Sequence, residues 1–301
     1  MLTAALQFLQ KTQNADGGWG AVPTRQSNTE ATALAVLALA SCPEARVACI
    51  ERGLQWLIEL QSSDGSWPIH RDLPHGSWAT ALATLALAGS DDHRTRAVKG
   101  ARWLLGHRGR SLGWLASLAY RLVPEKMAVQ LDPNLRAWSW TPDGFSWVEP
   151  TAYALIALKR LHADLGGSAA EHIREAERLL YDRVCSGGGW NHGNSNAYGV
   201  GIPPYPETTA LALIALQDRE AEPANRASLQ RLVTMLAEIE SWLSLSWAIV
   251  CLSVRGQDVA YLQRRLVRLY ARSGFLEETR VVALALLALS ERASPFRMGV
   301  S

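Results

Sequence analysis

Two kinds of segment alternate along the chain, and they differ in the spacing of their apolar residues. The first kind is a short run in which Ala alternates with Leu, Val or Ile. Such a run is apolar on every side, which predicts a helix buried all round. Four clear copies and two degenerate ones occur, at residues 32–39, 80–87, 151–158, 209–216, 245–252 and 282–289.

Segments of the second kind are amphipathic, with apolar residues at helical spacing and one charged face. They occupy residues 2–13, 48–61, 95–106, 170–185, 227–240 and 258–273. The alternation predicts an all-α protein in which an outer ring of helices surrounds an inner wall. We predict a single (α/α)6 barrel over residues 1–301. An open solenoid is the alternative, but its end repeats would need polar capping faces, and the last apolar run is as apolar as the first.

A repeated unit joins the two kinds of helix. Residues Ala5–Trp19 (ALQFLQKTQNADGGW) and Gly53–Trp67 (GLQWLIELQSSDGSW) each contain a helix, a Gln, an Asp-Gly turn and a Trp. Gly187–Trp190 keeps only the end of this unit. An aromatic insertion at about 107–147 and a glycine-rich loop at 187–206 both precede inner helices. Both loops should therefore open at one end of the barrel, where we expect the functional site.

Composition narrows the class of protein. The net charge of +2 argues against a dedicated nucleic-acid binder. Four cysteines are too few for a disulfide framework and indicate a reducing compartment. No leader segment is visible, and the most apolar stretch, 242–254, is shorter than the roughly 20 residues of a membrane span. We predict a cytoplasmic protein that can contact a membrane peripherally.

The repeated unit resembles the QW repeat of the squalene-hopene and oxidosqualene cyclases, within the superfamily of prenyltransferase and squalene-oxidase repeats. The resemblance implies an (α/α)6 barrel in which the Gln and Trp of the motif are structural. The chain is about half as long as a squalene-hopene cyclase, which stacks two barrels, and so resembles one of them. The family's acid motif, Asp-x-Asp-Asp-Thr-Ala, is similar to residues 147–152, Trp-Val-Glu-Pro-Thr-Ala. The resemblance implies that Glu149 stands at the position of the proton donor.

Apart from the resemblance, the local sequence allows two interpretations of Glu149. Glu30, Glu149 and Glu207 all lie two residues before the Thr of an inner helix. Each could face the helix dipole, and Ser27 and Ser146 could complete capping boxes with Glu30 and Glu149. Alternatively, Glu149 is a general acid whose pKa is set by an aromatic mouth. We select Glu149 as the catalytic candidate.

Twelve tryptophans are unusually many for this length. Trp19, Trp67 and Trp190 end Gly-x-Trp turns and are assigned to the structural repeat. Other aromatic residues can line a pocket, where ring faces stabilise developing cations; core packing is the alternative for each. The substrate-binding candidates are Trp78, Trp138, Trp140, Trp147, Tyr153, Tyr198, Glu207 and Trp247.

These observations favour a terpene-cyclase-like isomerase that protonates and cyclises a polyprenyl substrate in an aromatic-lined cavity, without a cofactor. One alternative is a non-catalytic isoprenoid- or lipid-binding barrel or scaffold. Another is a zinc-dependent prenyltransferase-like enzyme, for which Asp182, Cys185 and His192 are ligand types. A carbohydrate-active barrel is a further alternative. A cavity closed at its far end would favour an isoprenoid, whereas an open groove with exposed carboxylates would favour a sugar.

Overall fold

The computed structural model describes residues 1–111, 117–118, 122, 131–274 and 277–298. Most of the first part of the predicted aromatic insertion, residues 112–130, lies outside this described part. The inner helices are α2 (Thr29–Ala40), α4 (Thr80–Leu87), α7 (Val148–Arg160), α10 (Pro206–Ala215), α12 (Trp242–Val254) and α14 (Thr279–Leu289). The outer helices are α1 (Leu2–Lys11), α3 (Val47–Leu60), α5 (Arg94–Gly106), α9 (Ser168–Asp182), α11 (Pro223–Met235) and α13 (Ala260–Ser273).

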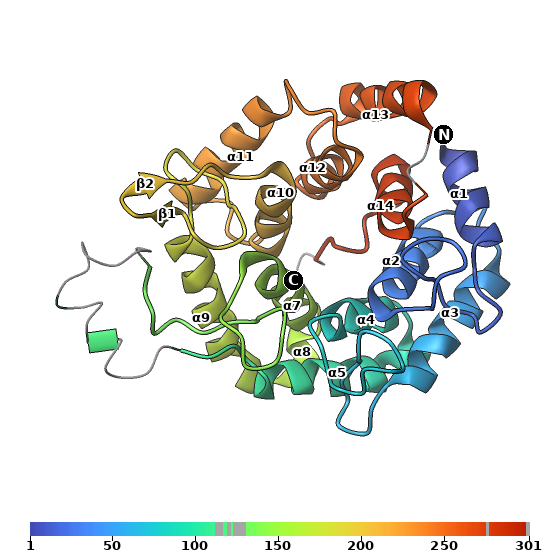
Figure 1. Ribbon diagram of the computed structural model, residues 1–301, viewed down its shortest axis with the longest axis horizontal. Coiled ribbons are helices and arrows are strands. Elements are labelled where there is room, and N and C mark those ends of the chain that lie inside the picture. The colour runs from blue at the N-terminus through green and yellow to red at the C-terminus, as the bar shows by residue number, and fades with distance from the viewer. Residues whose placement is uncertain (112–116, 119–121, 123–130, 275–276, 299–301) are drawn as a thin grey trace.

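Each inner helix packs against the next one, and α14 packs against α2, so the inner wall closes into a ring (Figure 1). The outer helices cover this ring, and α1 closes it from outside by packing on α14. Short elements complete the chain: η1 (Asp91–His93), α8 (His162–Leu165) and a hairpin of β1 (Asn196–Ala197) and β2 (Val200–Gly201). The predicted all-α barrel of alternating inner and outer helices is confirmed.

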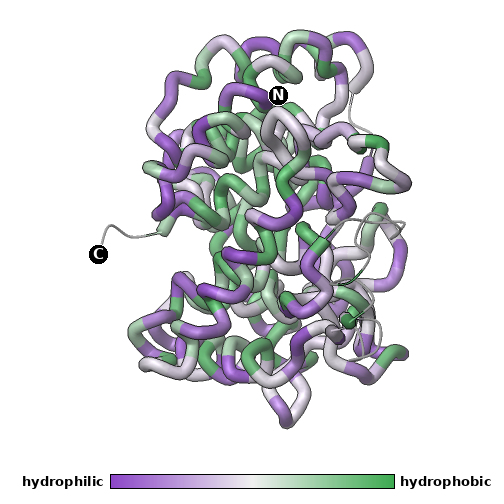
Figure 2. Tube along the Cα trace, turned by 90° about the vertical axis from the view of Figure 1, so that its left-hand side faces the viewer, coloured by the Kyte–Doolittle hydropathy of each residue, from purple (hydrophilic) through white to green (hydrophobic). Residues whose placement is uncertain are grey.

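The inner helices form because their apolar residues leave no face for water. Nearly every residue of α2, α4, α10 and α14 is buried, whereas α13 buries Leu266 alone among its residues. Figure 2 shows the apolar segments gathered in the interior and the hydrophilic ones outside. Charged groups are therefore favoured at the ends of the inner helices, where water or a partner can reach them.

Four tryptophans fasten outer helices to inner ones by the same pair of hydrogen bonds. Each indole Nε1 donates to a Leu carbonyl near the end of an outer helix, and each backbone N donates to the Thr Oγ1 of the next inner helix. The indole bonds are Trp19 to Leu9 (2.8 Å), Trp67 to Leu57 (2.7 Å), Trp138 to Leu104 (2.9 Å) and Trp190 to Leu180 (2.6 Å). The backbone bonds reach Thr32, Thr80, Thr151 and Thr209. We call these four residues the staple tryptophans.

The Gln of the repeated unit joins successive repeats. Gln13 Nε2 donates to the carbonyls of Gly17 (2.8 Å) and Cys49 (2.9 Å), and Gln61 Nε2 donates to those of Gly65 and Arg96 (3.0 Å each). Cys49 and Arg96 belong to the next outer helix in each case. One amide thus holds its own turn and the following repeat together.

The first prediction concerns glycines in outer helices that pass over staple rings. A Cβ on Gly53 would lie 2.6 Å from Val36 Cγ2 and 2.8 Å from Trp19 Cζ3, and one on Gly100 would lie 2.6 Å from Trp67 Cζ3. We expect Gly53→Ala to lower the free energy of unfolding by about 1–3 kcal/mol in a denaturant titration, because overpacking outweighs the better helix propensity of Ala. Gly106→Ala, which meets nothing within 4 Å, is the matched control and should leave stability unchanged or higher. Equal effects of the two would contradict the close-packing argument.

The residues that follow α14 cross the end of the barrel where the inner helices finish. Ser290 Oγ donates to the Ser41 carbonyl (2.6 Å) just beyond α2, and Arg160 at the end of α7 donates to the Arg297 carbonyl (2.7 Å). Gln217, just beyond α10, donates to the Phe296 carbonyl (2.9 Å) and accepts from the Met298 N–H (2.9 Å). We call residues 290–298 the tail; it covers the C-terminal end of the inner wall (Figure 1).

Candidate functional site at the barrel mouth

Four charged side chains occupy the same place on four inner helices. Glu30, Glu149, Glu207 and Arg280 are each the second residue of their helix, in α2, α7, α10 and α14. The inner helices all run in the same direction and their N-termini share one end of the ring, so the four side chains meet there. We call this end, opposite the tail, the mouth.

Each of these side chains has a partner at the mouth. His192 Nδ1, from the glycine-rich loop, lies 3.2 Å from Glu149 Oε2. Arg280 Nη1 lies 3.6 Å from Glu30 Oε1. Ser244 Oγ, from the first turn of α12, donates to Glu207 Oε2 at 2.8 Å. The mouth therefore carries three separate polar pairs above an apolar wall.

The predicted capping boxes do not form, which corrects the sequence analysis. The N-cap of α2 is Asn28, whose side chain accepts from the Ala31 N–H at 2.8 Å, while Ser27 donates to Asp16 in the preceding turn. Helix α7 follows Trp147 without a side-chain cap, and Ser146 Oγ accepts from the Ala137 N–H instead. Both serines form hydrogen bonds within their own turns, so the side chains of Glu30 and Glu149 have other partners at the mouth.

Burial and neighbouring charges act in opposite directions on the pKa values of the carboxyl groups at the mouth. Burial raises the pKa of the Glu149 carboxyl above its ordinary value, and the charge and hydrogen bond of His192 oppose that rise in part. Burial also raises the pKa of Glu30, against the lowering effect of Arg280. Carboxyl groups with raised pKa values retain protons at a higher pH than exposed ones do, which a general acid requires.

The second prediction follows from the His192 contact. Replacing His192 with Gln removes a positive neighbour that lowers the pKa of Glu149, so that pKa should rise further. Because the folded state then binds this proton still more tightly than the unfolded chain does, stability should be lost more steeply as the pH rises above the ordinary pKa of glutamate. Carboxyl-carbon NMR titration measures the shift directly. His172→Gln, on outer helix α9, is the control; a Glu149 titration unchanged in His192→Gln would contradict the contact.

An aromatic series descends from the mouth toward the tail. Trp140 meets Trp78 edge-on with ring centroids 4.7 Å apart, and Trp78 stacks on Tyr153 at 6.0 Å. Tyr153 lies 6.1 Å from Trp247, and Trp247 lies 5.3 Å from Phe296 of the tail. Tyr153 is four residues after Glu149, so it lies on the same face of α7 about one turn deeper. The structure thus brings together four predicted residues, Trp78, Trp140, Tyr153 and Trp247, and Tyr153 and Trp247 belong to the inner helices α7 and α12.

Three other predicted residues lie outside this series. Trp138 is a buried staple tryptophan that also lines a second pocket together with Trp78. Trp147 lines a separate pocket of about 260 Å³ with Leu135 and Phe145, away from the aromatic series. Tyr198 is 83% exposed at the turn of the β1–β2 hairpin, where its φ of 52° is left-handed.

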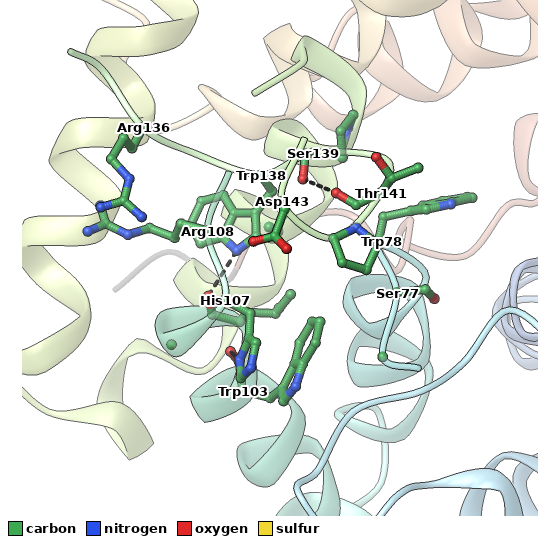
Figure 3. A pocket seen from close by; sticks show the side chains of 16 residues that line it. Ser77, Trp78, Trp103, His107, Arg108, Arg136, Trp138, Ser139, Thr141 and Asp143 are labelled. Atoms are coloured by element: carbon green, nitrogen blue, oxygen red, sulfur yellow. Dashed lines mark hydrogen bonds between the residues drawn. The ribbon is translucent and has the colours of Figure 1, made fainter. Parts of the chain in front are cut away.

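A further pocket of about 400 Å³ lies beside the mouth, between α5 and α7 and under the loop that contains Trp138 (Figure 3). Trp78 belongs to both, because it lines the pocket and also contacts Trp140 and Tyr153 of the aromatic series. The pocket is polar, and two of its charged residues are already paired: Arg108 with Glu175, and Asp143 with Arg110 at 3.3 Å. It can hold polar groups of a ligand that passes Trp78.

The potential zinc ligands are not assembled. The carboxylate of Asp182 accepts from the Asp132 N–H, Cys185 is buried, and His192 contacts Glu149. Within the described residues, no three His, Cys, Asp or Glu side chains form a group that could hold a metal ion. Across the same part of the chain, no helix has both the length and the apolar character to span a membrane.

Sequence reasoning missed Arg280 and Phe296. Arg280 stands two residues before Val282, the start of a degenerate apolar run, and the same count had already found the three glutamates. Phe296 follows the last repeat, where no periodicity indicates its position. Only the fold shows that the tail returns to the lumen.

Residues 1–72 match the family model of the squalene-hopene cyclase C-terminal domain. Over these residues the match agrees with the resemblance of the repeated unit to the squalene-hopene cyclases. The type II terpene cyclase MstE from Scytonema, solved in complex with merosterolic acid A as product, is 19% identical, with a TM-score of 0.54 over 98% of this chain and 80% of that one. No curated protein matches the chain at a significant level.

Two other solved structures have the same fold over almost their whole length. A protein from Actinoplanes is 17% identical, with a TM-score of 0.62 over 96% of this chain and 98% of that one. An α-amylase from Clostridium perfringens is 10% identical, with a TM-score of 0.64 over 96% and 97%. At these identities the likeness shows the barrel fold alone, since one fold hosts many functions.

Proposed function

We propose that the protein is a terpene-cyclase-like isomerase that binds a polyprenyl chain at the barrel mouth and starts its cyclisation by protonation. The observation that carries this proposal is the position of Glu149. Glu149 lies one helical turn from Tyr153 on the same face of α7, and Trp78, Tyr153 and Trp247 are 6.0–6.1 Å apart in succession. An acid one turn from a series of aromatic rings can make a cation that ring faces then stabilise.

Glu149 would donate its proton to a terminal alkene carbon of the substrate. The C–H bond that forms uses the π electrons, the adjacent carbon becomes cationic, and later loss of a proton balances the isomerisation. Burial raises the pKa of Glu149, which stabilises the protonated form before the step and makes it a weaker acid than an exposed carboxyl. After the step, His192 at 3.2 Å stabilises the carboxylate that remains. The two effects act on different protonation states and so do not cancel.

Aromatic side chains below the mouth would stabilise the cation as it moves along the chain. Each ring face contributes about 0.5–2 kcal/mol of cation–π attraction, depending on desolvation. Burial raises the pKa of Tyr153 well above its ordinary value, which keeps this phenol neutral. A neutral tyrosine presents a ring face to the cation without acting as a nucleophilic phenolate.

Support for an isoprenoid over a sugar comes from the apolar residues that lie between the mouth and the tail. The tail is bonded to Ser41, Arg160 and Gln217, and the lumen wall beneath the charged mouth is apolar. A substrate of this site therefore enters and leaves by the mouth. Among solved structures of this fold, a variant of MstE is in complex with geranylgeranyl dihydroxybenzoate, its substrate.

The test is product formation by the purified protein. It is incubated with geranylgeranyl diphosphate, squalene or a malto-oligosaccharide, and extracts are analysed by gas chromatography, or by sugar analysis for the last. We expect a cyclised isomer of an isoprenoid. Bound isoprenoid without product would instead indicate the lipid-binding alternative. Cleavage of the oligosaccharide without isoprenoid binding would overturn the proposal in favour of a carbohydrate-active barrel.

A further inference from the structure

Below the mouth, the lumen is filled by side chains. Tyr153 is 4% exposed, Trp247 3% and Phe296 1%. Tyr153 and Trp247 come from α7 and α12, whereas Phe296 comes from the tail, which reaches this position from outside the inner wall. The accessible part of the site thus ends at the level of Tyr153 and Trp247.

We infer that Phe296 sets the depth of the site and thereby limits the length of the isoprenoid chain that the protein accepts. Its ring lies 5.3 Å from that of Trp247 on the side away from the mouth residues, so it blocks movement of Trp247 toward the far end. This inference rests on the proposed function and names its specificity-determining residue.

Backbone hydrogen bonds hold Phe296 where it is. Its carbonyl accepts from Gln217, the next carbonyl accepts from Arg160, and Met298 N–H donates to Gln217. Arg160 at the end of α7 and Gln217 just beyond α10 therefore hold the tail backbone at and next to Phe296. Because the backbone and not the phenyl group makes these bonds, a smaller side chain at 296 removes the ring while leaving the tail bonded.

Removal of the ring should deepen the site. The side chain of Phe occupies roughly the volume of an isoprene unit, and an apolar cavity of that size accepts an apolar ligand group. Trp247 would then have room to move toward the tail, and the space above it would extend downward. Polar ligands would gain nothing, since the walls around Trp247 and Tyr153 are apolar.

Binding of uncharged isoprenoid alcohols tests the inference, with geraniol, farnesol and geranylgeraniol as probes of increasing length. Tryptophan fluorescence measures their dissociation constants for the wild type, Phe296→Ala and Phe296→Leu. We expect wild-type affinity to stop improving at one of these lengths. In Phe296→Ala the next longer alcohol should bind at least fivefold more tightly than it binds the wild type, with a smaller gain in Phe296→Leu.

The control is Phe8→Ala, which removes a phenyl group that packs on the core from outer helix α1. It should keep the wild-type order of affinities, and circular dichroism checks that each variant is folded. A Phe296→Leu variant that is folded and keeps the wild-type length profile would overturn the inference while the proposed function stands. Absence of binding of every alcohol to the wild type would overturn both.

Discussion

Glu149→Gln is expected to reduce formation of a cyclised product at least about 100-fold, because a positioned general acid contributes two to four orders of magnitude in rate. Gln has nearly the same shape as Glu, so the α7 N-terminus should keep its structure, and the amide can still contact His192. It has no proton of comparable acidity to give. Gas chromatography of timed extracts, with thermal unfolding measured alongside, separates the loss of chemistry from a loss of fold.

Glu171→Gln is the matched control for this substitution. Glu171 is also a first-turn glutamate, but it is exposed on outer helix α9. It should lose a few tenths of a kcal/mol of dipole stabilisation at most and no activity. If Glu149→Gln behaves in the same way, with full turnover and slightly lower stability, then Glu149 only stabilises its helix and the site has another acid.

The fold could be predicted because its signals repeat. Apolar runs such as 80–87 and 209–216 can be accommodated only in a buried wall, and the observed α4 and α10 coincide with them to within a few residues. The shared count of two residues before an inner-helix Thr also places Glu149 and Glu207 in the first turns of α7 and α10. The position of a residue within its repeat is enough to place it in space when every repeat packs in the same way.

A second role of a residue stayed hidden where a loop changes the count or binds a side chain. Trp138 lines the pocket of about 400 Å³ and is also a staple tryptophan, but the insertion separates it from Leu104 by 34 positions, whereas Trp67 is 10 from Leu57. Its spacing of 13 residues to Thr151 nevertheless equals that of Trp67 to Thr80, and this signal would have identified the staple. Ser27 has no such signal, since only the folded turn shows that Asp16 binds its hydroxyl.

Replacing a staple tryptophan should have the largest effect on the stability of the fold. We expect Trp67→Ala to lower the free energy of unfolding by about 3–5 kcal/mol in a denaturant titration. The ring is fully buried, and its removal leaves a cavity beside Gly100. It also removes one of the two hydrogen bonds that the Leu57 carbonyl accepts, the other coming from the Gln61 N–H. Thr80→Val, which removes only the hydroxyl that accepts the Trp67 N–H, should cost about 1–3 kcal/mol.

Trp140→Ala is the counterpart at the mouth, where the ring is only partly buried and contacts Trp78 edge-on. It makes no hydrogen bond to an outer helix among the described residues, so its loss should cost less than about 1.5 kcal/mol. Its effect should fall on isoprenoid binding instead, whereas Trp67→Ala, under conditions where it is folded, should bind isoprenoids like the wild type. A Trp140→Ala variant as unstable as Trp67→Ala would mean that Trp140 also fastens the repeats. The aromatic series would then be part of the core and would begin below the mouth, at Trp78.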